Sequence, residues 1–522
     1  MTERTARSAG APTRRAMVLG AAATPLLWAA GLWAAGAAST RAAAPEGRWR
    51  VASSANFNVY SAGDERQLRA YTLMLEDFDM TLRFMHGLSL DKAADRKLDV
   101  HLIDNKAELR VTYPDAHEDW AGYYVATSRD VVCVALRPRR VSSQDDDSND
   151  ITMHEYAHHF MRRNLTYAYA PWLVEGYAEY VATTLFKGDE IIVGKINANR
   201  GSWLMNAGWL PLEDLLTKRS GEIVSERRNN YYPQAWLLTH YFMGDKKRKA
   251  QLEAYIRAVG EGTGSVEAME KATGMTLAEL TLALRAYTKG DLPLQGFSRT
   301  RKREVPITVT RLPASADDLV LQRVRMAHDD FDKDGAAFVG EIRKVAERYP
   351  GDAYAELTLA RAEQLAGDPE AGMAILDRRL AADPADLLAL EYKALGLLAK
   401  AGKQPDDAAA LNKAAGAVLA KAFQVDSNRY QILLAFARSR KTAPGYPSDN
   451  VMEALLLANE LAPQVSEVTM ETVQALAARR EYGHAAFLLK PLVNDPHGRR
   501  SERAVQLLKE LETKAAAGKS AA

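Results

Sequence analysis

The sequence predicts an α+β domain with a small mixed sheet, followed by an all-α region of repeated helix pairs. Short alternating apolar stretches dominate before residue 140, helical periodicity dominates from about 150 onward, and prolines interrupt the pattern near residue 300. The 522 residues are 47% hydrophobic and 26% charged, which suits two or three ordinary globular domains. Lys plus Arg (68) nearly equals Asp plus Glu (67), so no overall field favours a nucleic-acid partner.

Residues 1–44 predict an export signal. Arginines precede an uncharged, alanine-rich run from Ala16 to Thr40, as in a secretory signal. The pair Arg14–Arg15 resembles a twin-arginine signal. We expect cleavage after Ala44 or, as an alternative, after Ala38; an uncleaved segment would anchor the protein in the membrane. In either case the expected location is the periplasm or the cell envelope.

The part of the chain that follows predicts the small sheet. Leucine, tyrosine and phenylalanine at three- and four-residue spacing predict a helix over 65–88. Alternating or continuous apolar runs predict strands over 50–60, 97–103, 122–125 and 131–136. The single cysteine, Cys133, lies in the last of these runs, where we expect a buried strand residue and no ligand or nucleophile.

A short motif within the next predicted helix has the spacing of metal ligands. Residues 154–158 read His-Glu-Tyr-Ala-His. Positions i and i+4 of a helix share a face, so His154 and His158 could bind one metal ion. Glu155 is then placed to accept a proton from a metal-bound water. The alternative is an amphipathic helix whose histidines are ordinary surface or core residues.

The segment after this helix offers the remaining ligand. A catalytic zinc site has three protein ligands and an open fourth position, and Glu175 is the candidate for the third ligand. Glu179 follows one turn later on the same helical face, where its carboxylate could hold the outer N–H of a histidine, which we expect to be His154. Metzincins continue the motif with a glycine and a histidine, but Met161 and Asn164 occupy those positions.

The sequence resembles a known group of enzymes at these motifs. The residues that carry the resemblance are HEYAHH (154–159), PWLVEGYAEY (171–180) and YPQAW (232–236). They resemble the gluzincins, zinc metallopeptidases of the peptidase-MA-like superfamily, and most closely exported bacterial proteins with a DUF1570-like domain. The resemblance implies one Zn²⁺ per chain, held by His154, His158 and Glu175, with Glu155 as the general base. In gluzincins an edge strand of the sheet binds the extended peptide substrate.

Hydrolysis of this type also needs a donor for the oxyanion. Tyr232 precedes Pro233, and proline favours the first turn of a helix, so Tyr232 would lie at a helix N-terminus. The resemblance points to the same tyrosine. Tyr231 and His240 are alternative donors, and Tyr232 could equally be a packing residue.

The second half of the chain predicts helical repeats. Pro350 and Pro384 are 34 residues apart, which is the tetratricopeptide period, and the alternative is an irregular helical bundle. Prolines and a basic stretch after residue 289 predict a linker. The predicted boundaries are 1–44 for the export signal, 45–289 for the gluzincin-like domain, 290–315 for the linker, 316–515 for the tetratricopeptide-like solenoid and 516–522 for a disordered tail.

Together these features predict an exported zinc metallopeptidase that hydrolyses peptide bonds, most simply as an endopeptidase. Its helical repeats are expected to bind a protein partner or protein substrate, because stacked helix pairs form concave surfaces that hold peptides. The alternative is an interaction or scaffold protein that contains a relic or zinc-stabilised peptidase domain.

Overall fold

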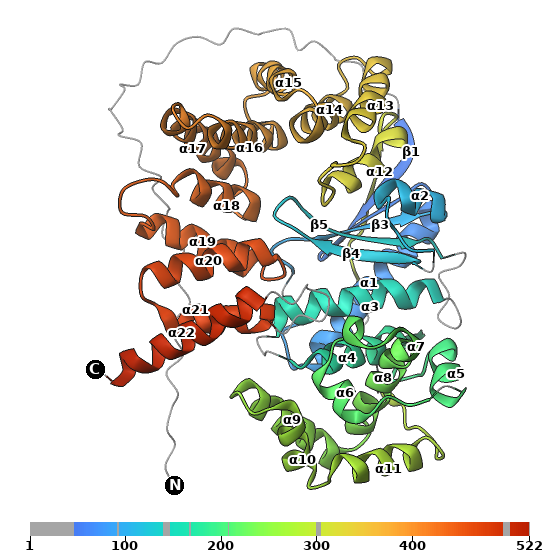
Figure 1. Cartoon of the computed structure of the whole chain (residues 1–522). Coiled ribbons are helices and arrows are strands. Elements are labelled where there is room, and N and C mark those ends of the chain that lie inside the picture. The colour runs from blue at the N-terminus through green and yellow to red at the C-terminus, as the bar shows by residue number, and fades with distance from the viewer. Residues whose placement is uncertain are drawn as a thin grey trace.

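The computed structural model describes residues 46–90, 93–118, 120–138, 147–165, 169–206, 208–298, 304–493 and 502–520. The predicted export signal (1–44) therefore lies outside the described residues. Within the described ranges, no helix is both long enough and apolar enough to cross a membrane. The chain forms a sheet covered by helices, a group of helices beside it, and a curved row of helices that returns to the sheet (Figure 1).

The main sheet is mixed, as predicted. Its strands are β1 (Glu46–Ser53), β2 (Phe57–Ser61), β3 (Leu98–Ile103), β4 (Gly122–Ala126), β5 (Val131–Leu136) and β9 (Thr308–Pro313). The strand order is β4-β5-β3-β2-β1-β9, with β2, β3 and β5 mutually parallel and the other pairs antiparallel. The predicted single strand over 50–60 is wrong, because the chain turns at Ser54 and pairs β1 with β2 as a hairpin.

Helices cover both faces of this sheet. Alternate residues of β5 point to opposite faces, so Cys133 packs with α1 (Glu65–Met85) and α3 (Asp147–Asn164). Val134 packs on the other face with α12 (Ala316–Met326) and α2 (Lys106–Thr112). Cys133 is only 1% exposed, which confirms the prediction of a buried strand residue.

A group of helices follows α3. It contains α4 (Pro171–Ala182), α5 (Ala198–Asn206), α6 (Leu212–Thr217), α7 (Ser225–Arg228), α8 (Tyr231–Met243), α9 (Lys246–Gly260), α10 (Ser265–Thr273) and α11 (Leu277–Tyr287), with η1 (Ser220–Glu222) as a short 3₁₀ turn. Helices α4 and α8 approach very closely at Gly176, where a Cβ would lie 2.3 Å from the carbonyl oxygen of Ala235. Only glycine permits this approach, which fixes the helix that carries Glu175.

The prediction of a linker over 290–315 is wrong. The segment contains β8 (Gln295–Ser298), which joins β6 (Leu185–Lys187) and β7 (Glu190–Val193) in a second sheet. It also contains β9, which pairs with β1 as an edge strand of the main sheet. Pro293, Pro306 and Pro313 suggested a linker, but only Pro313 lies in a strand, and an edge strand tolerates proline because its outer N–H groups need no partner. The sheet domain therefore does not end at Lys289.

The rest of the chain is a long all-helical region compatible with a tetratricopeptide-like solenoid. Its helices are α13 (Gly335–Arg348), α14 (Ala353–Ala366), α15 (Pro369–Ala382), α16 (Leu387–Lys403), α17 (Ala408–Val425), α18 (Tyr430–Ser439), α19 (Asp449–Leu461), α20 (Ser466–Ala478), α21 (Tyr482–Val493) and α22 (Glu502–Ser520). Asp352 and Asp386 cap α14 and α16, so the first helix pair repeats after 34 residues. Helix α22 continues to Ser520, so the predicted disordered tail is wrong for 516–520.

The helical region is not a free arm. Successive helices pack side by side, and the row curves back along the sheet domain (Figure 1). The side-chain hydrogen bonds that join the two parts include Tyr430 to the Thr127 carbonyl (2.7 Å), Gln431 to the Arg129 carbonyl (3.1 Å), Arg163 to the Leu461 carbonyl (3.2 Å) and Arg219 to the Val493 carbonyl (2.6 Å). Both the β4–β5 turn and the end of α3 are therefore held by repeat helices.

Candidate metal centre

Three predicted ligands converge in the structure. His154 and His158 lie one turn apart on α3, and their Nε2 atoms are 3.0 Å apart. Glu175 projects from α4, and its Oε2 lies 3.5 Å from each of these nitrogens. Glu175 is fully buried (0% exposed), so its carboxylate is desolvated and faces the two imidazoles.

The spacing of these donor atoms suits zinc. Zinc binds histidine nitrogen and carboxylate oxygen at about 2.0–2.2 Å in tetrahedral geometry, which separates neighbouring ligand atoms by roughly 3.3–3.6 Å. The separations of 3.0 and 3.5 Å among His154, His158 and Glu175 lie close to this range. Among the described residues, these three form a cluster of possible metal ligands whose donor atoms all lie within 4.8 Å of one another. The three donors could therefore hold one metal ion, and their spacing suits zinc.

Acidic groups surround the first histidine. Burial opposes the charged form of His154, but the nearby carboxylates of Glu175, Glu179 and Glu155 outweigh burial and raise its pKa. The Oε1 atom of Glu179 lies 3.5 Å from His154 Nδ1, on the side of the ring away from the other ligands. This is the position from which a carboxylate orients a metal-bound histidine.

Arg200 on α5 is a residue of this site that sequence reasoning did not find. Its Nε and Nη2 atoms donate to the two carboxylate oxygens of Glu179 at 3.1 and 2.9 Å. The same guanidinium lies over the ring of Tyr232, 4.8 Å from its centroid. Arg200 therefore connects the carboxylate behind His154 with the candidate oxyanion donor. No motif marks it, because a lone arginine in a short helix gives no pattern to detect.

Glu155 lies near enough to the sheet for its charge to act on residues of β4 and β5. Burial raises the pKa of Tyr124 on β4 and of Cys133 on β5, and the charge of Glu155 raises both further. Tyr124 also forms a hydrogen bond with His159 of α3; its hydroxyl lies 3.0 Å from His159 Nδ1. The charge of Glu155 therefore acts both on His154 and on residues of β4 and β5.

The candidate oxyanion donors differ in their surroundings. Tyr232 lies in the first turn of α8, and burial, followed by the charge of Glu175, raises its pKa to about 12. Its hydroxyl donates to the Ser220 hydroxyl at 3.3 Å, whereas the hydroxyl of Tyr231 donates to the Lys218 carbonyl at 3.0 Å. His240 lies two turns further along α8, fully buried, with Nδ1 3.0 Å from the Tyr287 hydroxyl. Of the three, Tyr232 has the longest hydrogen bond, and the charge of Glu175 acts on its hydroxyl.

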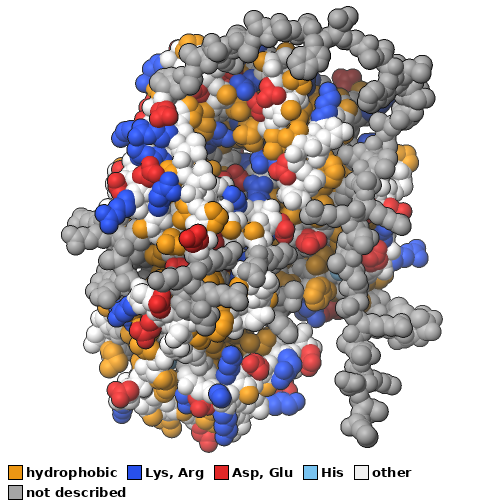
Figure 2. All heavy atoms as spheres, turned by 180° about the vertical axis from the view of Figure 1, so that it is seen from behind, with side chains coloured by type: hydrophobic (Ala, Val, Ile, Leu, Met, Phe, Trp, Pro, Cys, Tyr) orange, Lys and Arg blue, Asp and Glu red, His pale blue; other side chains and the backbone are white. Residues whose placement is uncertain are grey.

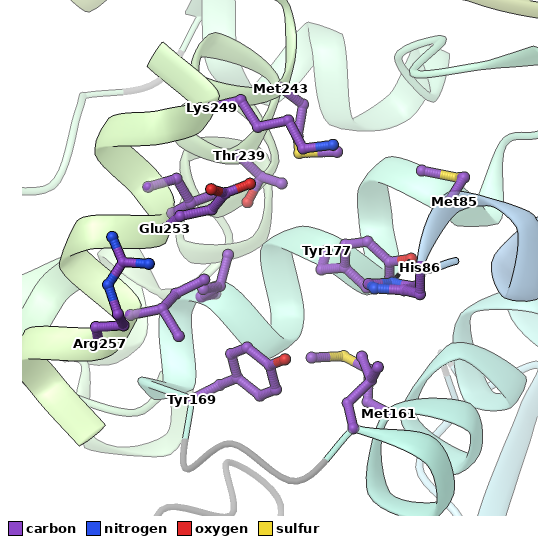
Figure 3. A pocket seen from close by; sticks show the side chains of 14 residues that line it. Met85, His86, Met161, Tyr169, Tyr177, Thr239, Met243, Lys249, Glu253 and Arg257 are labelled. Atoms are coloured by element: carbon purple, nitrogen blue, oxygen red, sulfur yellow. Dashed lines mark hydrogen bonds between the residues drawn. The ribbon is translucent and has the colours of Figure 1, made fainter. Parts of the chain in front are cut away.

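A separate pocket of about 420 Å³ adjoins the C-terminal end of α3 (Figure 3). Its walls are largely apolar, and none of the three candidate ligands lines it. Figure 3 shows His86 beside Tyr177, and their side chains are joined at 2.7 Å; Lys249 and Arg257 extend from α9 on the opposite side. Burial lowers the pKa of His86 to about 4, so its ring is neutral at pH 7. The pocket is not part of the metal centre.

For the peptide hydrolysis that the sequence predicts, we expect Arg200→Met to reduce kcat/KM by about tenfold to a hundredfold, because Glu179 would lose the partner that orients it. Arg200→Lys should recover part of this loss, since it keeps the charge but not the paired hydrogen bonds. Arg227→Met, at an exposed arginine, serves as the control. Equal activity of Arg200→Met and the control would show that Arg200 does not support the site.

Comparisons with known proteins add little to this geometry. No protein-family model matches the sequence, and no curated protein matches it. Among solved structures, one similar chain is from the crystal structure of a thermophilic TPR protein of Thermus thermophilus. It shares 15% sequence identity with a TM-score of 0.29, and the match covers 38% of this chain and 95% of that chain.

Proposed function

We propose that this protein is a zinc-dependent peptidase of the gluzincin type. The observation that carries the proposal is the convergence of His154, His158 and Glu175, whose donor atoms lie 3.0–3.5 Å apart. Two histidines from one helix and a glutamate from the next form a donor set typical of hydrolytic zinc sites. The neighbouring Glu155 and Glu179 supply the further carboxylates that such chemistry needs.

The residues of the chain have distinct roles in the proposed reaction. Bound zinc would polarise the scissile carbonyl and lower the pKa of a water molecule. Glu155 accepts the proton of the attacking water and passes it to the leaving amine. Tyr232 keeps its proton at neutral pH, because its pKa is raised to about 12, and can therefore donate a hydrogen bond to the developing oxyanion. Glu179 and Arg200 hold His154 in position.

Strand β4 is the proposed docking edge for the substrate. In the described part of the chain β4 pairs with one neighbour, β5, and it contacts α3 directly. An extended peptide could add to its other edge through main-chain hydrogen bonds. A peptide bound in this way would have one of its peptide bonds beside α3, the helix that contains Glu155.

The helical repeats are proposed to bind a protein partner or to select protein substrates. Their contacts with the β4–β5 turn, from Tyr430 and Gln431, place them next to the proposed docking edge. We also propose that the protein acts outside the cytoplasm, as its N-terminal sequence predicts. A scaffold with a relic domain remains the competing function, and it would lack hydrolytic activity.

Hydrolysis of unstructured peptides tests the function. We expect the purified protein to cleave a mixed peptide library, to lose this activity with a zinc chelator and to regain it when zinc is returned. Cleavage sites are read by mass spectrometry. Cleavage that is unaffected by chelation, or absence of cleavage from zinc-loaded, folded protein, would contradict the proposal and favour the scaffold.

A further inference from the structure

A second polar site lies far from the metal centre in the fold. A cavity of about 210 Å³ lies between the face of the main sheet that packs on α12 and the repeat helices α14 and α16. Sheet residues such as Asp99 and His101 line one wall, and arginines from the helices line the other. Figure 2 shows basic and acidic side chains gathered in a hollow of the rear face, at the height where Figure 1 places α12 and α18.

Some of the cavity's arginines have carboxylate partners. Arg429 pairs with the buried Glu391 of α16. Arg129 pairs with Asp330. These pairs neutralise each other and account for the local structure, so they leave no excess charge in the cavity.

Arg323 and Arg361 are different. Among the described residues, neither guanidinium has a carboxylate within ion-pair distance. Arg323 instead lies over the ring of Tyr354, 4.4 Å from its centroid, and Arg361 lies over Tyr392 at 5.2 Å. Arg361 also donates to Gln364 Oε1 at 3.4 Å, and Arg323 hydrogen-bonds to the Tyr392 and Tyr354 side chains. Stacking fixes the plane of each guanidinium, and the remaining N–H groups at its edge can meet an oxyanion.

Two further carboxylates line the cavity, Asp130 and Asp99. Asp130 pairs with Arg96 at 2.8 Å, so Asp99 is the one left to offset Arg323 and Arg361. Asp99 accepts a hydrogen bond from Asn58 at 2.9 Å, and burial together with the charge of Asp130 raises its pKa to about 6. Burial lowers the pKa of Arg361, and the charges of Tyr392 and Glu391 offset that shift only in part. Holding two partly buried cations against one unpaired carboxylate is costly unless an anion joins them.

We propose that this cavity binds the carboxylate or phosphate group of a small anion between Arg323 and Arg361. Paired N–H donors of arginine match both oxyanions. The volume of about 210 Å³ is large enough for a small anion such as phosphate or succinate. Because strands and repeat helices both line the cavity, the anion would join the two parts of the protein.

Calorimetric titration of the full chain tests the proposal, with inorganic phosphate and succinate as probes in a buffer that contains no other oxyanion. We expect one binding site per chain for at least one probe, and the stronger probe identifies the group that the cavity prefers. Arg323→Met and Arg361→Met should each raise Kd by about tenfold or more, since each removes a charged pair of donors. Arg348→Met is the control, because Arg348 is exposed and pairs with Asp318.

Succinamide, a neutral analogue of succinate, tests whether the ligand must be charged without any change to the protein. We expect that it does not bind. Circular dichroism checks that each variant is folded, and Arg361→Lys provides a milder change that should still weaken binding. The proposal is overturned if neither anion binds the unaltered protein. It is equally overturned if succinamide binds as tightly as succinate, or if the folded cavity variants bind as tightly as Arg348→Met.

Discussion

Glu155→Gln is expected to lower kcat for peptide hydrolysis by about 10²- to 10⁴-fold while zinc stays bound. Glutamine has nearly the same shape as glutamate but cannot accept the proton of the attacking water. The donor atoms of His154, His158 and Glu175 come from other side chains and remain in place. Steady-state kinetics on a cleaved peptide, together with metal analysis of the same sample, measures both effects.

Glu213→Gln is the matched control, since Glu213 is an exposed glutamate on α6. It should keep full activity and full zinc content. If Glu155→Gln keeps the activity of this control, Glu155 is not the base. If Glu155→Gln instead loses zinc, its role is structural and the proposed mechanism fails.

A chain that ends after Lys289 is expected not to fold into a stable sheet domain. It would lack β9, which pairs with β1, and α12, whose Val320 and Val324 are 2% and 3% exposed against the sheet. Each buried side chain of this kind contributes about 1.5–3 kcal/mol, and whole domains are stable by only about 5–15 kcal/mol. Loss of the strand and the helix together should therefore exceed the stability available.

Thermal denaturation followed by circular dichroism measures this prediction. A chain that ends after His328 is the matched comparison, because it keeps β8, β9 and α12 and lacks the repeat helices. We expect a cooperative transition for the longer chain and none for the shorter one. A cooperative transition of the shorter chain at the same temperature would show that the sheet domain is complete at Lys289.

The sequence predicts the local parts of this fold well. The strand at 131–136 and the pairing of His154 with His158 depend on spacing within one element, which the sequence displays directly. Glu175 could also be predicted from the sequence, because it belongs to the next helix and completes a known set of zinc ligands.

The missed features depend on contacts between distant parts of the chain. Strand β9 pairs with β1 although more than 250 residues separate them. The six residues of β9 do not identify the strand with which it pairs. Arg200 reaches Glu179 from a different helix. The cavity at Arg323 and Arg361 forms only because the repeat helices curve back over the sheet. Such contacts follow from tertiary packing and not from local pattern.

The most direct measurement of the central claim is the zinc content of the purified protein after mild dialysis. We predict about one zinc per chain in the unaltered protein and in His484→Ala, a control at an exposed histidine of α21. The double variant His158→Ala, Glu175→Ala keeps one of the three ligands and should retain essentially no zinc. Stoichiometric zinc in the double variant, or a folded unaltered protein that binds no zinc when it is supplied, would contradict the account.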